Sequence, residues 1–455
     1  MQLYTSGRDA PVASQTTATV SRIVYKGLIV AFGVVLYFMY ILTVGERMFP
    51  AKEMFGGSDA RYLSTLLFVA GTCLSQMVFF ALSAFTSGVM SSPISEAFFS
   101  TRALGASLGK SLPPEEVLPT MLASLFLAAL LTSAVFFALF ALRAEKALQK
   151  IPSSVSQALF VVIGFLCIVF ANERVGGLSI GVPPWAVYAV FNALGVVLCV
   201  AAHCLKKMGL VVGKYSILFI AGGLSLAFYL AKLVGGASFA SLTAQGWFAS
   251  DPSAPAALVL PRIEGFGGVN VAAVCAHLPN ILGIVVVNAL QFPINFPPTS
   301  KALGQTPSAR KELLANAVAN AATSLVGASA GALPTATIAL HGAGSESRGD
   351  TLAIAVGLCV AFWGGYRYTL YIPFVVFDTL LLVLGTGIVL RTFLGVFKTK
   401  PQTIPFILSV VLVSGLTQSL VCGLLAAAVF HCCGHGLSRV RAWRRLVARC
   451  LNHKE

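Results

Sequence analysis

Two short stretches of this sequence decide its fold: TSGVMSSPISEAFF at residues 86–99 and GASAGALPTATI at residues 327–338. Each runs from small residues through a proline into a short helical segment, within a chain that is otherwise strongly apolar. Proline suits the first turn of a helix, where its missing N–H would have no intrahelical partner. We therefore expect Pro93 and Pro334 each to begin a short helix inside a membrane.

The positions of the two prolines favour an internal repeat. Pro93 lies about 69 residues after the first apolar segment begins near position 24, and Pro334 lies about 63 residues after Val271. Interrupted apolar segments at matching places in two halves are typical of inverted-repeat membrane proteins. The alternative is that the small residues only form helix-packing surfaces, which are common in membrane bundles. The matching offsets favour the repeat.

The composition excludes a soluble globular protein. Of 455 residues, 57% are hydrophobic and 10% are charged, whereas soluble proteins carry roughly 25% charged residues. The net charge of +15 would suggest a nucleic-acid partner for a soluble domain, but no nucleic-acid-binding motif occurs, and we expect no such partner. The apolar stretches are continuous rather than alternating, which excludes a β-barrel. The sequence predicts an all-α polytopic membrane protein in a lipid bilayer.

The apolar stretches predict about 14 transmembrane segments, because a crossing helix needs about 20 residues. We place spans near 24–44, 62–85, 117–141, 154–172, 184–204, 209–234, 271–294, 311–328, 350–365 and 369–391, with two more inside 403–430 and the two interrupted segments. These form a transmembrane domain at 23–430, with repeats of seven at about 23–235 and 270–430. Residues 1–22 form a polar tail, and residues 431–455 form a basic tail.

Basic and charge-balanced loops alternate along the chain, which predicts its orientation. Lysine and arginine accumulate in cytoplasmic loops, and Lys206 with Lys207 and Arg391 with Lys398 mark two such loops. Both termini are therefore expected on the cytoplasmic side. The first span has no small-residue cleavage site and is expected to be retained. The plasma membrane and a vacuole-like organelle remain alternatives for the location.

Two helices that begin inside the membrane offer unpaired N–H groups and partial positive charge to an anion, or to the carboxylate of an amino acid. Glu96 and Asp378 stand out as candidate coupling groups because ionisable residues are rare in these spans. Glu96 has a structural alternative in offsetting the helix dipole, and Asn288 and Tyr37 have one in structural hydrogen bonding. The predicted substrate-binding residues are Ser91, Ser92, Pro93, Ser95, Glu96, Gly331, Leu333, Pro334, Thr335, Thr337, Asn288 and Tyr37.

No cofactor and no metal site are expected from the sequence. The run HCCGH at residues 431–435 contains metal-ligating residue types, but its spacing matches no standard zinc pattern.

The stretch ARKELLANAVAN at residues 309–320, followed by GALPT at residues 331–335, resembles the sulfate permease family of sulfate and anion exchangers. It is similar to that family's R/K-E-L helix leading into a G-G-x-P half-helix. Residues 26–50 and 75–102 look more like a fungal and protist branch that has been tied to vacuolar basic amino acids. The resemblance implies a seven-plus-seven fold with core and gate domains, substrate between the two short helices, and a possible homodimer.

The sequence also departs from the family's pattern. Asn288 stands where a carboxylate is frequent, and Ala339-Leu340 replaces a Ser-Arg pair. The sequence ends 25 residues after Phe430, so we expect no STAS domain, the soluble regulatory domain typical of the family. These departures leave proton coupling and anion selectivity open.

These features predict a secondary active transporter or exchanger of a small anion such as sulfate or bicarbonate, working by alternating access. A vacuolar-type transporter of basic amino acids is the rival, and Glu96 separates the two because an ionised glutamate repels an anion and attracts arginine or lysine. A transport-inactive scaffold and an integral-membrane enzyme are more distant alternatives. We expect no enzyme, because the histidines His203, His277, His341 and His431 are scattered without catalytic spacing.

Overall fold

The structure is a computed structural model that describes most of the chain. The described residues are 12–48, 60–93, 97–145, 153–178, 181–210, 213, 215–248, 268–332, 334–399, 403–417, 422–423, 425–426 and 429.

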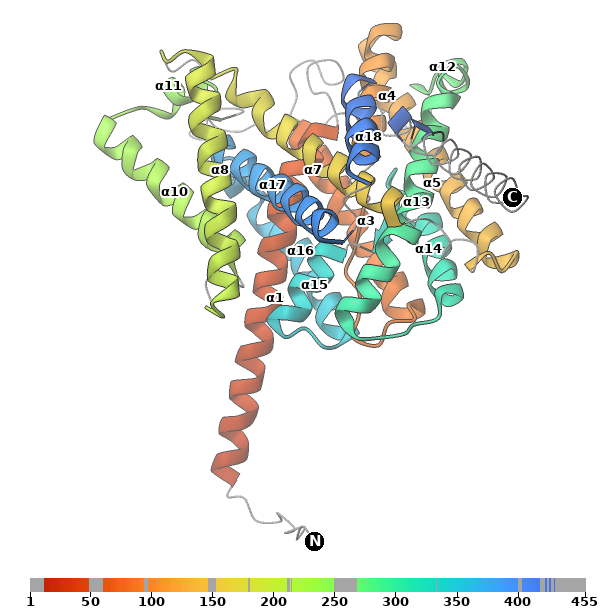
Figure 1. Cartoon of the computed structure of the whole chain (residues 1–455), viewed down its shortest axis with the longest axis horizontal. Helices are drawn as coiled ribbons and strands as arrows, with labels where there is room; N and C mark the ends of the chain where they lie inside the picture. The colour runs from red at the N-terminus through yellow and green to blue at the C-terminus, as the bar shows by residue number, and fades with distance from the viewer. Residues whose placement is uncertain are drawn as a thin grey trace, which may run out of the picture.

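Nine helices in the described part of the chain are long and apolar enough to cross a membrane. They are α1 (Val12–Met48), α3 (Ala60–Leu82), α5 (Pro114–Ala141), α7 (Ser153–Val175), α8 (Pro184–Lys207), α10 (Ser216–Gly235), α13 (Leu278–Leu303), α16 (Arg348–Thr369) and α17 (Phe374–Thr399). The prediction of an all-α polytopic membrane protein is confirmed (Figure 1).

Shorter elements complete the fold and account for the interrupted segments. They are strands β1 (Ser91–Pro93) and β2 (Ala330–Ala332), and helices α4 (Phe98–Ser111), α11 (Phe239–Ala244), α12 (Val271–Ala276), α14 (Ala309–Ser324), α15 (Pro334–Ala343) and α18 (Ile404–Thr417). With α4, α14, α15 and α18, the described chain holds 13 of the 14 expected segments. The last one falls on residues 418–430, which are only partly described.

Three expected boundaries differ from the structure. Pro93 does not begin a helix: it ends strand β1, and α4 begins at Phe98, whereas Pro334 is the first residue of α15 as expected. The span expected at 271–294 is broken at His277, and α13 continues to Leu303 through three internal prolines. Membrane helices tolerate proline where neighbouring groups satisfy the freed carbonyls. Helix α1 begins at Val12, inside the segment expected to be a polar tail.

The helices pack as two groups. We define the core group as α1, α3, α4, α5 and α13–α16, in which α3 packs on α16 and α5 packs on α14. The gate group is α7, α8, α10, α17 and α18, in which α17 packs on α7 and α8. Helices α7 and α17 cross closely, because a Cβ added at Gly385 would lie 2.6 Å from the Gly164 carbonyl oxygen. Val287 and Ile294 of α13 join the apolar cluster of the gate helices, so α13 connects the two groups.

The two halves of the chain build the same local structure in opposite directions. Gly88 (φ +77°) lies three residues before β1, and Gly327 (φ +64°) lies three residues before β2. This left-handed backbone favours glycine, and it turns each chain from its helix into its strand. The strands then pair antiparallel. Antiparallel pairing of equivalent segments is the arrangement expected of an inverted repeat.

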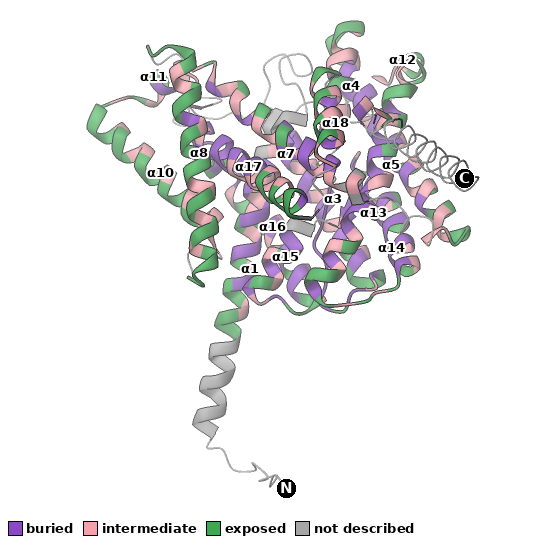
Figure 2. Cartoon of the chain, viewed as in Figure 1, coloured by how far each residue is buried: buried purple, intermediate pink, exposed green. Residues whose placement is uncertain are grey.

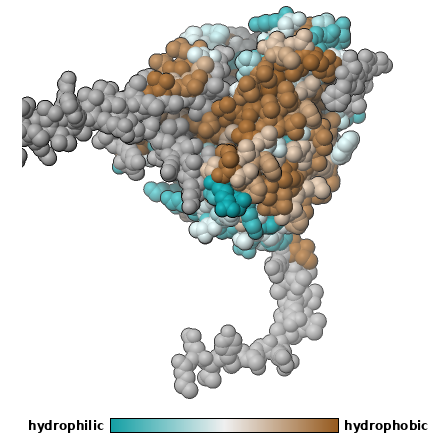
Figure 3. Space-filling view, turned by 90° about the vertical axis from the view of Figure 1, so that its right-hand side faces the viewer, coloured by the Kyte–Doolittle hydropathy of each residue, from teal (hydrophilic) through white to brown (hydrophobic). Residues whose placement is uncertain are grey.

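The outer surface is suited to lipid. Helices α8 and α10 at the periphery are largely exposed, whereas the core group is largely buried (Figure 2). Exposed apolar residues such as Val197, Leu230 and Leu233 cover these outer helices. A broad hydrophobic area lies between hydrophilic patches on the face shown in Figure 3. Such an area matches the apolar interior of a bilayer flanked by its polar surfaces.

The packing of α3 on α16 predicts a cross-link between the two halves of the chain. The Sγ atoms of Cys73 and Cys359 lie 3.1 Å apart, about 1 Å more than a disulfide bond requires. Diamide, which takes up two electrons and two protons, should convert the two thiols to a disulfide. We expect maleimide to label two fewer cysteines after this treatment, and Cys73→Ser should abolish the loss. Undiminished labelling of both thiols would contradict the helix pairing.

Candidate functional site

The centre of the molecule contains six residues of extended backbone. Ser91 pairs with Ala332, Ser92 with Gly331 and Pro93 with Ala330. The first helical turn of α15 follows β2 directly, and α4 begins shortly after β1 at Phe98. The two half-helices therefore start from opposite ends of one antiparallel strand pair.

Two carboxamide side chains hold the strands to their own halves of the fold. Gln76 of α3 accepts from the Ser91 N–H (2.8 Å) and donates to the Val89 carbonyl (3.1 Å). Asn320 of α14 accepts from the Ala330 N–H (3.0 Å) and donates to the Ala330 carbonyl (2.8 Å). Each carboxamide thus replaces a missing strand neighbour. Buried backbone groups need such partners because an orphaned one costs roughly 1–3 kcal/mol.

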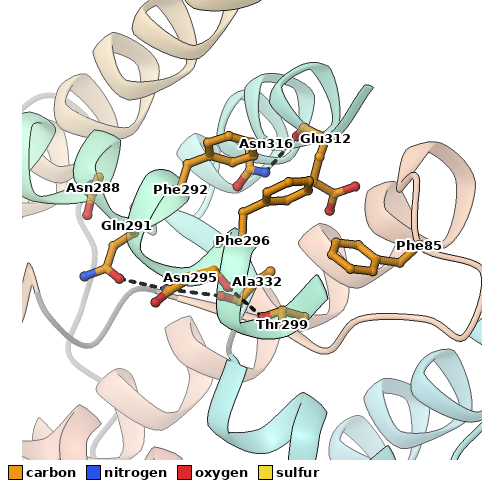
Figure 4. Close-up of a pocket in the computed structure, with 11 residues that line it drawn as sticks. Phe85, Asn288, Gln291, Phe292, Asn295, Phe296, Thr299, Glu312, Asn316 and Ala332 are labelled. Atoms are coloured by element: carbon orange, nitrogen blue, oxygen red, sulfur yellow. Dashed lines mark hydrogen bonds between the residues drawn. The ribbon is translucent and has the colours of Figure 1, made fainter. Parts of the chain in front are cut away.

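A polar pocket lies against the end of β2 (Figure 4). It contains about 350 Å³ of space between atoms, part of it open to solvent. Its lining consists of four carboxamides, one hydroxyl, one carboxyl, three phenyl rings and strand backbone: Asn288, Gln291, Asn295, Asn316, Thr299, Glu312, Phe85, Phe292, Phe296, Gly331 and Ala332. No lysine, arginine or histidine is among these described lining residues.

Helix α13 supplies one polar wall of this pocket. Asn288, Gln291, Asn295 and Thr299 recur at helical spacing on one face of an otherwise apolar helix, and all four are buried. Asn295 donates to the Gln291 Oε1 (2.8 Å) and to the Ala332 carbonyl (3.4 Å), which connects α13 to β2. Asn288 donates to the Thr132 hydroxyl (3.3 Å), and its Oδ1 has no hydrogen-bond donor among the described residues.

Glu312 of α14 supplies the carboxyl group of the pocket and is 1% exposed. Its oxygens accept from the Ser83 hydroxyl (3.0 and 3.2 Å) and from the Ala84 N–H (2.8 Å). Arg348 donates to the carbonyls of Phe80, Ser83 and Phe85 rather than to this carboxyl group. Together Glu312 and Arg348 hold the end of α3 where the chain turns toward β1.

A second cavity lies beyond the strands, on the side of α4. It is lined by Pro93, by Ala97, by Thr101 of α4, by residues 327–329 and by apolar residues of α3, α5 and α13. Ala97 precedes α4 and makes no side-chain cap. Ile284 lines this second cavity and Asn288, one helical turn further, lines the first. The two cavities therefore follow one another along α13, with the strand pair beside them.

The structure brings several predicted substrate-binding residues together. Gly331 and Asn288 line the first pocket, and Pro93 lines the second cavity. The Ser91 hydroxyl donates to the Gly331 carbonyl (3.4 Å), and the Ser92 hydroxyl donates to the Pro93 carbonyl (3.1 Å). Thr337 accepts from the Met90 N–H (3.0 Å). These three hydroxyls are engaged with the backbone of the strand region.

The other predicted residues lie elsewhere or outside the description. Tyr37 and Asp378 are each 1% exposed, Tyr37 in α1 and Asp378 in α17, and neither lines either of these cavities. Pro334 and Thr335 are the first two residues of α15. The residues outside the described chain are Ser95, Glu96, Leu333 and the run 431–435.

The sequence-based prediction did not include five polar lining residues: Gln291, Asn295, Thr299, Glu312 and Asn316. A signal for them was present, because 288, 291, 295 and 299 form a polar stripe in α13, and 312 and 316 share a face of α14. Only the tertiary structure shows that the two stripes face the same pocket.

Comparison with known proteins identifies the architecture. The transmembrane domain of BicA, a cyanobacterial bicarbonate transporter, aligns with a TM-score of 0.55 at 14% identity, over 89% of this chain and 97% of that one. SLC26A9 aligns with a TM-score of 0.57 at 12% identity, over 95% of this chain and 72% of that one. The chain shares their fold. The murine Slc26a9 anion transporter in its inward-facing state gives a TM-score of 0.55 at 13% identity, over 94% of this chain and 72% of that one. No protein-family model and no curated protein matches the sequence.

Loss of the Asn320 side chain should destabilise the core group. Asn320→Ala leaves the N–H and the carbonyl of Ala330 without their partner, so we expect a loss of about 2–5 kcal/mol in the free energy of unfolding. Unfolding of the variant and of the wild-type protein in detergent micelles measures this difference in free energy. Asn192→Ala is the matched control, because Asn192 pairs with Asn172 and Tyr188 in the outer gate helices. Equal effects of both variants would contradict the role of Asn320.

Proposed function

We propose that this protein is a secondary active transporter of a small anion that works by alternating access. The observation that carries the proposal is the polar pocket at the end of β2, where the short helix α15 begins. The anion transporters that share the fold support it. Helix α15 begins two residues after Ala332 of the lining. The start of a helix presents N–H groups and partial positive charge, which would offset the absence of a cation among the described lining residues.

The two cavities along α13 support alternating access. One is lined by Gly331 and Ala332 of β2 and the other by Pro93 of β1, and α13 also packs against the gate group. Movement of the gate group against the core group would open one cavity while closing the other, with the strands as the fixed element. Rigid movement of one helix bundle around a fixed site is the usual mechanism for inverted-repeat transporters.

Asn288 favours bicarbonate over sulfate as the substrate. Its Oδ1 is a buried acceptor with no donor among the described residues. Bicarbonate carries an O–H that can donate to this oxygen, whereas sulfate at neutral pH only accepts hydrogen bonds. A site that leaves a buried acceptor unpaired discriminates against the substrate that lacks the donor.

A basic amino acid is the second candidate substrate. Glu312 gives the pocket one acidic group, which could bind an ammonium or guanidinium group. Glu96, the residue expected to separate the two substrates, lies outside the described chain. For either substrate we place both termini on the cytoplasmic side, with a homodimer in the plasma membrane or a vacuole-like organelle as the expected setting.

Replacing Asn288 tests the pocket. Proteoliposomes that contain the wild-type protein should take up radiolabelled bicarbonate or sulfate, and Asn288→Leu should reduce uptake about 10- to 100-fold, which corresponds to a loss of about 1.4–2.8 kcal/mol. Asn192→Leu, the same change in the gate group, should leave uptake within about 2-fold. Uptake of arginine without anion uptake would show that the substrate is a basic amino acid and not a small anion. Uptake of neither would overturn the proposed function.

A further inference from the structure

Glu312 is a buried carboxyl group in the wall of the proposed substrate pocket. It is 1% exposed and projects from α14 beside Phe296 and Phe85 (Figure 4). The carboxyl groups predicted from the sequence do not share this position: Asp378 lines neither cavity, and Glu96 is not described. Glu312 is therefore the carboxyl group that lines the proposed pocket among the described residues.

No cation is paired with Glu312 among the described residues. Its partners are the Ser83 hydroxyl and the Ala84 N–H, both neutral. Arg348 of α16 faces it from beyond Ser83 but donates to backbone carbonyls. On its own helix, Arg310 lies over the Phe140 ring of α5. The described residues that share the pocket from α13 and β2 carry no other titratable group.

This environment disfavours a permanent negative charge and also disfavours an anion next to one. A buried carboxylate without a paired cation carries a large desolvation penalty. An anion in the same pocket adds like-charge repulsion, which is strong where water is scarce. A proton on Glu312 removes both costs at once.

The hydrogen bonds of Glu312 fit both of its protonation states. A hydroxyl group donates to a carboxylate and accepts from a carboxylic acid. The Ser83 hydroxyl can therefore accept from Oε1 when that oxygen gains a proton, while Oε2 continues to accept from the Ala84 N–H. The Ala84 N–H therefore keeps its acceptor in both protonation states.

We propose that Glu312 couples transport to protons: it takes up one proton when the anion enters the pocket and releases that proton when the anion leaves on the other side. The inference rests on the proposed anion transport. One anion and one proton move together in the same direction, so the pair crosses without net charge for a monovalent anion.

Glu312→Gln tests the coupling. In proteoliposomes, an inward proton gradient should increase wild-type uptake of radiolabelled sulfate at least 5-fold, and a pH-sensitive dye should report proton entry with the anion. Bicarbonate does not serve here, because with a proton it forms CO2, which crosses the bilayer unaided. Glu312→Gln should show slower uptake that no longer responds to pH, without anion-driven proton entry. Glu312→Asp, which retains a titratable group, should retain proton entry. Glu116→Gln, which alters a carboxyl group that binds Asn270 away from the pocket, should match the wild type.

Three outcomes would overturn the coupling while leaving anion transport intact: wild-type uptake without proton entry, uptake driven by a sodium gradient instead, or pH-driven proton entry that persists in Glu312→Gln. Absence of any anion uptake by the wild-type protein would overturn the proposed function itself. Melting temperature and gel filtration in detergent distinguish a folded Glu312→Gln protein from a misfolded one. If that variant misfolds, pH-independent uptake by Glu312→Asp would overturn the coupling.

Discussion

Backbone groups that leave helical geometry inside a membrane must find partners within the protein, and the rest of this structure depends on that constraint. Strands β1 and β2 satisfy only one edge each by pairing with one another. The other edges would be orphaned in a medium without water. Gln76 of α3 and Asn320 of α14 supply the hydrogen-bond partners for these other edges. The helices on either side of the strands are therefore fixed by hydrogen bonds as well as by packing.

This constraint is met twice, once in each half of the chain, and the repetition explains the helix packing. Each strand belongs to one half but pairs with the other, which brings α3 against α16 and α5 against α14. The core group is therefore interlocked across the repeat. The gate helices α7 and α17 pack on one another and contribute no strand. Among the described residues, the non-helical backbone inside the fold therefore lies in the core group.

The sequence predicted the elements that depend on local chemistry and missed those that depend on tertiary contacts. Continuous apolar runs located the long helices, and Pro334 marked the first residue of α15 because proline fits a helix start without losing a hydrogen bond. Pro93 looked equivalent but ends a strand, since the pairing of residues 91–93 with β2 is not encoded nearby. The polar stripe of α13 was visible, yet Asn288 alone was selected, because a stripe does not show what it faces.

Glu312 is a second case in which the sequence alone does not show what a side chain faces. It belongs to the stretch that carried the family resemblance, and it lies in the first turn of α14, where a carboxylate offsets the helix dipole. The turn at Ser83 and Ala84, more than 200 positions away in the chain, encloses that carboxylate and removes it from water. A pocket of carboxamides beside it would bind an anion more weakly than arginine would. Weak binding would suit the proposed transport, because the substrate must leave as readily as it enters.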